Sequence, residues 1–225
     1  MTLVLAIVSG NGSTVLEIIN ASPDLVRKPA VIGATREAAS HYFFPEIRHY
    51  LYAGDTALHM AAAGFKSEIA QSLIDCGANC GARNRRGAEP LHYASDCNTW
   101  NATAQVATIE CLIRAGADPN STDKGGVAPI HRAVRTRCAA AVQALLSGGA
   151  KLDLRNKSGS TPLHLAVQNT GRGGSGTPEA IEQQRQIILL LLQNGASTKD
   201  RDGVGKIIDQ IITAGWIREL LDAAR

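Results

Sequence analysis

The fold is decided by the stretch STPLHLAV at residues 160–167, because closely similar stretches occur three more times along the chain. They read DTALHMAA at 55–62, AEPLHYAS at 88–95 and VAPIHRAV at 127–134. Four of the six histidines in the sequence occupy the same place in these stretches, namely His59, His92, His131 and His164. A short phrase that recurs with its histidine at a fixed position indicates a repeat architecture.

The spacing of the four histidines gives the length of the repeat. His59 and His92 are 33 residues apart, as are His131 and His164, whereas 39 residues separate His92 from His131. A second recurring phrase places a glycine 15 residues before the next phrase histidine in three units, at Gly77, Gly116 and Gly149. The additional residues therefore fall within the second and fourth units, near 96–105 and 168–180.

Each unit carries signals for two helices and a loop. A threonine or glutamate before proline, as at Thr161 and Pro162, is typical of a helix start, because proline is tolerated in the first turn. The recurring glycine is typical of a helix end, where a left-handed residue is favoured. These residues resemble the ankyrin repeat, whose period and TPLH phrase the sequence matches four times. The resemblance implies an all-α ankyrin-repeat solenoid of stacked helix-turn-helix units with protruding β-turn or hairpin loops.

We expect the whole chain to form a single ankyrin repeat domain of about six stacked units. The terminal units are degenerate, with Val4 and Gln210 in the histidine position, as expected of units that cap an open-ended core. The expected divisions are an N-terminal capping unit (1–22), an aromatic-rich insertion (23–54), four repeats (55–87, 88–126, 127–159 and 160–204) and a C-terminal capping unit (205–225).

The phrase histidines are candidates either for chemistry or for holding the fold together. The resemblance implies the structural role, because histidine in this position of an ankyrin repeat begins a helix and hydrogen-bonds neighbouring loop groups. Histidines one repeat apart lie on helices whose axes are about 8–10 Å apart. Zinc ligands lie within about 2.1 Å of one ion, so this row does not easily close a metal site. We expect no catalytic residue, no metal and no other cofactor here.

Candidate partner-binding residues are sought where the sequence departs from the repeat. The insertion contains HYFFPEIRHYLY at 41–52, with five of the nine aromatic residues of the chain. We expect Phe43 and Phe44 to be buried and Tyr50 and Tyr52 to lie nearer the surface, either packing the loop or anchoring a partner. Cations recur at the expected loop tips and after the third phrase. The predicted partner-binding set is Tyr50, Tyr52, Arg85, Arg86, Lys124, Arg132, Arg135 and Lys157.

These patterns predict a non-catalytic protein–protein interaction scaffold that binds a partner through loop tips and a concave groove. The basic row favours a partner with an acidic surface. The rival interpretation is a small-ligand receptor or enzyme with a pocket between the 23–54 insertion and the first repeats, whose polar groups are His41, Glu46, His49 and Asp55.

The two other insertions allow two interpretations each. Trp100 is a packing residue or an exposed anchor. The stretch TGRGGSGTPE at 170–179 is a linker or a phosphate-binding loop, and the missing GK[ST] ending favours the linker.

Composition limits the remaining classes. The 225 residues are 44% hydrophobic and 19% charged, as in a globular chain, and the net charge of +3 counts against a nucleic-acid partner. The apolar opening at 3–8 is too short to span a membrane. Five irregularly spaced cysteines favour reduced thiols over a disulfide framework. We expect a cytoplasmic monomer.

Overall fold

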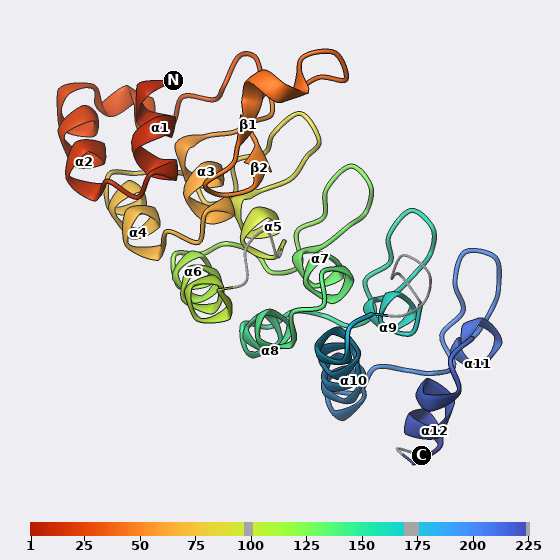
Figure 1. The fold of residues 1–225 in the computed structure, drawn as a ribbon. Coiled ribbons are helices and arrows are strands. Elements are labelled where there is room, and N and C mark those ends of the chain that lie inside the picture. Colours follow the sequence, from red (N-terminus) through yellow and green to blue (C-terminus); the bar gives the residue numbers. More distant parts are fainter. Residues whose placement is uncertain (97–100, 169–175, 224–225) are drawn as a thin grey trace.

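The computed structural model describes residues 1–96, 101–168 and 176–223. Helices within these ranges form two rows that run the length of the molecule (Figure 1). The inner row, on the side of the protruding loops, contains α1 (Thr2–Val8), α3 (Ala57–Ala63), α5 (Pro90–Ala94), α7 (Pro129–Arg135), α9 (Pro162–Ala166) and α11 (Ile208–Ile211). The outer row contains α2 (Gly12–Ala21), α4 (Ser67–Asp75), α6 (Ala102–Arg114), α8 (Ala139–Ser147), α10 (Pro178–Gln193) and α12 (Gly215–Ala223). The prediction of an all-α solenoid is confirmed.

The helices begin and end at the residues that recur in the sequence. At the start of α9, Thr161 is the N-cap, Pro162 takes the first helical position and the Thr161 hydroxyl accepts a hydrogen bond from the His164 N–H. The outer helices α4, α6, α8 and α10 are each followed by a cap residue and then a glycine with φ between +88° and +92°, at Gly77, Gly116, Gly149 and Gly195. This left-handed conformation is one that glycine adopts without a steric penalty, so the glycines end the helices as predicted.

The units stack through both rows of helices. Each inner helix contacts the next inner helix, and α2, α4, α6, α8 and α10 do the same along the outer row. Their apolar side chains form one hydrophobic core that extends from Leu3 in α1 to Leu221 in α12. Because each unit packs mainly on its neighbours, the two termini lie at opposite ends of the stack (Figure 1).

The 23–54 insertion follows the N-terminal helix pair and leads to α3. It contains η1 (Pro23–Val26), η2 (Ala39–Tyr42) and the antiparallel pair β1 (Phe43–Phe44) and β2 (His49–Tyr50). Phe44 is buried, but Phe43 is 38% exposed, so the expectation that both would be buried is wrong for Phe43. Successive side chains of a strand point to opposite faces. The Phe43 ring instead packs on Tyr50, its partner in β2, with 4.8 Å between the ring centres.

The backbone of the insertion approaches the chain just before α3. The Ala34 N–H donates a hydrogen bond to the Leu51 carbonyl at 2.7 Å. A Cβ atom at Gly33 would lie 2.6 Å from the backbone nitrogen of Ala53, a distance that real Cβ atoms do not tolerate. Glycine at position 33 therefore allows the two backbone segments to lie side by side.

The insertions in the second and fourth units lengthen their outer helices. Helices α6 and α10 have 13 and 16 residues, compared with 9 each in α4 and α8. Residues 97–100 and 169–175 lie outside the described part of the chain. The interpretation of Trp100 falls on these residues, and so does that of the glycine-rich stretch at 170–179 except for its last four residues, which lead into α10. Among the helices described here, we find none with the length and apolar character needed to cross a membrane.

Candidate protein-interaction surface

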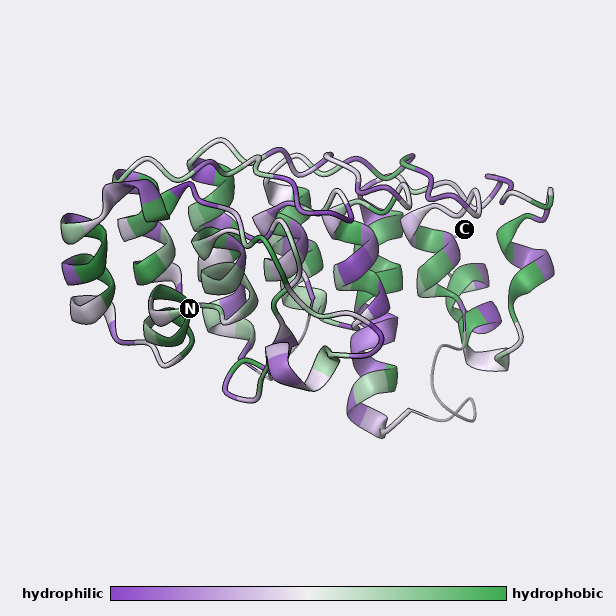
Figure 2. Ribbon diagram, turned by 90° about the horizontal axis from the view of Figure 1, so that it is seen from above, coloured by the Kyte–Doolittle hydropathy of each residue, from purple (hydrophilic) through white to green (hydrophobic). Residues whose placement is uncertain are grey.

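The loop tips of successive units follow one another along one edge of the stack (Figure 2). Backbone N–H groups donate to carbonyl oxygens of the preceding loop at 2.8–3.0 Å, joining Arg85 to Ala53, Lys124 to Arg86, Lys157 to Gly125 and Gly203 to Ser158. The first of these bonds attaches the end of the insertion to the loop of the first complete unit. The tips therefore form one continuous row, as the repeat period predicts.

Each loop is also closed internally by an asparagine or aspartate that the sequence analysis did not single out. In the first complete unit, the side-chain oxygen of Asn84 accepts hydrogen bonds from the backbone N–H groups of Arg86 and Ala88 at 2.9 and 3.0 Å. The same pair of bonds recurs in the next three loops, at Asp123, Asn156 and Asp202. A side chain that accepts two backbone N–H groups fixes the turn, so the tips are presented in a defined geometry.

The phrase histidines join consecutive units. The Nδ1 atom of His59 accepts a hydrogen bond from the Thr56 N–H at 3.1 Å, and Nε2 lies 3.0 Å from the Ala88 carbonyl of the next unit. His92 and His131 make the equivalent pairs of contacts, with Nε2 near the carbonyls of Val127 and Ser160, whereas Nε2 of His164 has no partner among the described residues.

The environment of His59 and His92 keeps both side chains neutral. Burial lowers the pKa of His59 and His92 to about 4. The neutral ring of His59 has one lone pair, at Nδ1, which accepts from the backbone, and one N–H group, at Nε2, which donates to the next unit. Both nitrogens are occupied, so this side chain holds two units together and has no free site for a proton or a metal ion.

Four of the predicted partner-binding residues meet where the insertion joins the row. The Arg86 guanidinium lies 4.3 Å from the centre of the Tyr52 ring, and the Arg85 guanidinium lies 5.7 Å from it. The Tyr50 ring is 6.2 Å from the Tyr52 ring. Together with four residues of the insertion, these side chains line a pocket of about 310 Å³; the four are Ala34, Thr35, Arg36 and Ala39. Positive charge and aromatic rings thus share one concave site, which we call the arginine–tyrosine pocket.

The carboxylate of Asp55 holds the backbone of Tyr52 in this position. Its buried carboxylate accepts hydrogen bonds from the Tyr52 N–H at 2.6 Å, from Nδ2 of Asn84 at 2.9 Å and from the Tyr93 hydroxyl at 3.0 Å. Burial raises the pKa of Asp55 to about 6, although the three hydrogen bonds and Arg85 act in the opposite direction. The carboxylate therefore links the insertion to the loop of the first unit and to α5.

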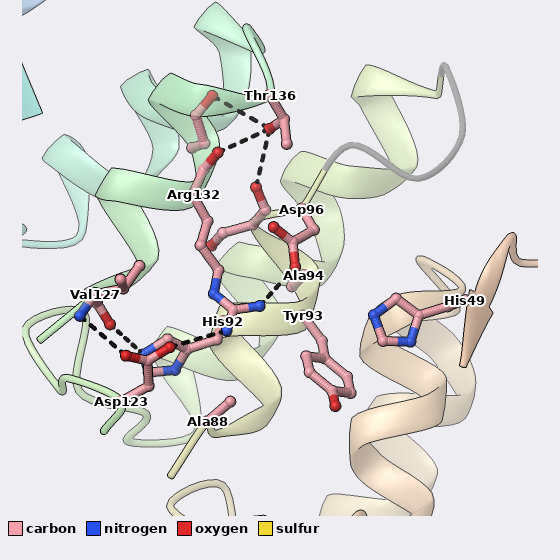
Figure 3. Close-up of polar contacts among 12 residues, drawn as sticks. His49, Ala88, His92, Tyr93, Ala94, Asp96, Asp123, Val127, Arg132 and Thr136 are labelled. Atoms are coloured by element: carbon pink, nitrogen blue, oxygen red, sulfur yellow. Dashed lines mark hydrogen bonds and ion pairs between the residues drawn. The ribbon is translucent and has the colours of Figure 1, made fainter. Parts of the chain in front are cut away.

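The remaining predicted residues differ in their availability. Lys124, Lys157 and Arg135 are exposed. Arg132, in contrast, reaches between two carboxylates (Figure 3), with 2.6 Å to Oδ2 of Asp96 and 3.2 Å to Oδ2 of Asp123. Its side chain is only 12% exposed, so its guanidinium is already paired within the chain. This position does not favour the predicted contact of Arg132 with a partner.

The four residues of the rival pocket are not brought together. His41 and Glu46 are exposed, whereas Asp55 is buried with its carboxylate occupied. The half-buried His49 ring faces Tyr93 (Figure 3), with 4.4 Å between the ring centres. A cavity of about 410 Å³ beside the insertion is lined by Asp55 but not by the other three. Within the described ranges, no cluster of histidine, cysteine and acidic side chains could hold a metal ion.

The stacked helix pairs, the joined loop tips and the histidines between units define a repeat protein of the α-solenoid class. Comparison with known families identifies the family within this class. Ankyrin repeats in three copies match residues 100–202, and a single ankyrin repeat matches residues 53–85. The chain belongs to the ankyrin repeat family. Ankyrin repeats are generally protein–protein interaction modules, and the family is typically non-enzymatic.

Two curated proteins share part of this sequence. The chain is 41% identical over 81 residues to the ankyrin repeat and LEM domain-containing protein 1 homolog of Caenorhabditis elegans, covering 36% of this chain and 10% of that protein. It is 34% identical over 77 residues to a probable serine/threonine-protein kinase of Dictyostelium discoideum, covering 33% of this chain and 8% of that protein. The chain thus spans a tenth or less of the length of these relatives.

Proposed function

We propose that this chain is a non-catalytic scaffold that binds a partner protein through its loop tips and the concave groove beside them. The observation that carries the proposal is the row of backbone hydrogen bonds between consecutive tips, from Ala53 to Gly203. A surface that is ordered before binding loses less conformational entropy when a partner docks. The joined tips therefore suit recognition of another folded or extended chain.

The charges along this row support a partner with an acidic surface. Arg85, Arg86, Lys124 and Lys157 are exposed on consecutive tips, and Arg135 is exposed on the adjacent helix α7. Tyr50 and Tyr52 add half-exposed aromatic rings at one end of the row. Tyrosine and arginine are enriched among the residues that contribute most to protein interfaces. The same positive field accelerates encounter with an acidic partner.

The described side chains give no support to a catalytic role. Hydrogen bonds to the backbone occupy both ring nitrogens of His59, His92 and His131, and three donors occupy the carboxylate of Asp55. We place the scaffold in the cytoplasm, since the cysteines at 76, 80, 111 and 138 are free thiols that suit a reducing compartment. We also propose that it acts as a monomer.

The proposal is tested by quantitative capture of partners from a cell extract. The bait is the full chain, compared with a Lys124→Glu/Lys157→Glu variant that reverses two tip charges. The matched control is Arg114→Glu, because Arg114 is exposed on the outer helix α6, away from the tips. A partner that binds the row is depleted about tenfold or more by the tip variant and retained by the control. Capture that is unchanged by the tip variant contradicts this function.

A further inference from the structure

Some arginines at the loop tips form ion pairs with a carboxylate of the chain and others do not. Arg83 pairs with Glu89 at 3.0 Å, and Arg155 pairs with Asp200 at 3.5 Å. Arg85 and Arg86, between these two in the row, have no carboxylate partner among the described residues. Lys124 and Lys157 also have no ion-pair partner in the described ranges, but each is the single unpaired cation of its tip, whereas Arg85 and Arg86 are adjacent at the arginine–tyrosine pocket.

A third arginine lines the same pocket. Arg36, from the insertion, is exposed and also has no ion-pair partner in the described ranges. None of the residues that line this pocket within the described chain is acidic. Three arginines thus line a cavity of about 310 Å³, and the carboxylate of Asp55, which interacts with Arg85, is buried outside its lining. A pocket lined by three arginines and by no acidic residue favours binding of an anion from outside the chain.

The pocket is held in shape before any ligand arrives. The Nη2 atom of Arg85 donates a hydrogen bond to the Ala34 carbonyl at 2.6 Å, and this bond connects the insertion to the tip of the first complete unit. The Arg86 guanidinium is placed over the Tyr52 ring, and Asp55 holds the Tyr52 backbone. Among the described residues, no hydrogen bond occupies the remaining side-chain N–H groups of the three arginines, so a ligand can bind them.

The size and chemistry of the pocket identify the group that fits it. A volume of about 310 Å³ is at the lower limit for small-ligand sites and suits a single side chain more than a cofactor. Planar guanidinium groups match carboxylate and phosphate oxygens in pairs of parallel hydrogen bonds. A phosphorylated side chain carries a charge of about −1.5 to −2 and has three acceptor oxygens. It therefore neutralises and hydrogen-bonds three arginines more completely than a single carboxylate does.

We propose that the arginine–tyrosine pocket binds one phosphorylated side chain of the partner protein, with Arg36, Arg85 and Arg86 on the phosphate and the rings of Tyr50 and Tyr52 beside its stem. This proposal rests on the proposed scaffold function and adds to it a requirement for phosphorylation. Binding of the partner then depends on a kinase that modifies it.

Fluorescence anisotropy with labelled peptide pools tests the proposal. Each pool has random flanks around a fixed central phosphotyrosine or phosphoserine, and matched pools carry the unmodified residue or glutamate. We expect one phosphorylated pool to bind about tenfold or more tightly than both matched pools, and inorganic phosphate to compete with it. Equal binding of the glutamate pool, or sedimentation with phosphoinositide vesicles without any phosphopeptide binding, would overturn the proposal.

Variants locate the site. Arg36→Ala and Arg86→Ala remove side chains whose guanidinium groups hold no part of the fold through hydrogen bonds in the described chain, and each is expected to weaken the phosphopeptide about tenfold or more. Arg86→Lys keeps the charge but loses the paired geometry, and is expected to recover part of the affinity. Arg114→Ala should leave the affinity unchanged. Phosphopeptide binding that survives both alanine variants overturns the assignment to this pocket.

The outcome for the partner protein separates this proposal from the scaffold function. If phosphatase treatment of a captured partner leaves its affinity unchanged while Lys124→Glu/Lys157→Glu still abolishes capture, the scaffold function stands and the phosphate proposal is wrong. If the tip variant does not affect capture, the scaffold function is wrong, whatever the peptide pools show.

Discussion

Gln105 and Gln184 occupy the same structural position in the two units with lengthened outer helices. Each lies eleven residues before the left-handed glycine that ends its helix. The buried amide of Gln105 donates from Nε2 to the Ala94 carbonyl at 2.9 Å, and that of Gln184 donates to the Ala166 carbonyl at 2.7 Å. Both acceptors are the last residues of inner helices, whose final carbonyls lack partners within the helix. The glutamines thus join the two helices on either side of an insertion.

We expect Gln105→Ala and Gln184→Ala each to lower the free energy of unfolding by about 1–2 kcal/mol, since each leaves a buried helix-end carbonyl without its donor. Urea unfolding followed by circular dichroism measures the change. Gln186→Ala is the matched control, because Gln186 lies on the same helix as Gln184 and is exposed. Losses no larger than that of the control would show that these amides do not join the helices.

The phrase histidines should differ in their contribution to stability. His92→Ala removes a contact between Nε2 and the Val127 carbonyl of the next unit, at 3.0 Å, and we expect it to lower the unfolding free energy by about 1–3 kcal/mol. His164→Ala should cost less, because Nε2 of His164 has no partner among the described residues. Thermal unfolding of both variants beside His41→Ala, which changes an exposed histidine, measures the difference. A larger loss for His164→Ala would contradict the assigned contacts.

Stability should fall as the solution is acidified through the range in which unfolded histidine binds a proton. Burial lowers the pKa of His59 and His92 from 6.5 to about 4, so between these values the unfolded chain binds more protons and the unfolding free energy decreases as the pH falls. Each decrease in pKa corresponds to on the order of 3 kcal/mol. Asp55 acts in the opposite direction, because its pKa is raised from 3.8 to about 6 and the folded chain holds its proton more tightly.

Urea unfolding at a series of pH values measures the net effect. We expect the midpoint to decrease between about pH 6.5 and about pH 4. In His92→Gln the pH dependence should be shallower, since glutamine does not titrate. A midpoint that stays constant across this range, or a slope that His92→Gln leaves unchanged, would contradict the account of neutral buried histidines.

Arg132 is expected to contribute to folding more than to binding. In Arg132→Met the half-buried carboxylates of Asp96 and Asp123 lose their shared guanidinium, and we expect the unfolding free energy to fall by about 3 kcal/mol. Arg135→Met is the matched control, because Arg135 is exposed on the same helix. Denaturant unfolding of both variants measures the difference. Equal stability of the two would show that the ion pairs are not structural.

The sequence was sufficient for the fold because the residues that begin and end its helices recur at fixed intervals. It was less informative about side chains whose roles depend on another unit. One exception is regular: Asn84, Asp123, Asn156 and Asp202 each lie eight residues before the residue in the histidine position, so their shared role in closing a loop is visible in the sequence. The pairing of Arg132 with Asp96 joins two units across an insertion, so no fixed interval predicts it. The prediction that Phe43 is buried was wrong because two adjacent aromatic residues in a strand point to opposite faces and cannot both face the core.

The central claim is that partners bind at the row of loop tips, and site-specific photo-crosslinking tests it most directly. A photoreactive phenylalanine analogue replaces Lys124 at a tip or, as the control, Arg114 on the outer helix α6, both of which are exposed. The chain is irradiated in a cell extract, and crosslinked proteins are identified by mass spectrometry. We predict that position 124 crosslinks to a specific protein and that position 114 does not. Crosslinking of that protein from position 114 and not from position 124 would place the interface on the outer helices and contradict the account.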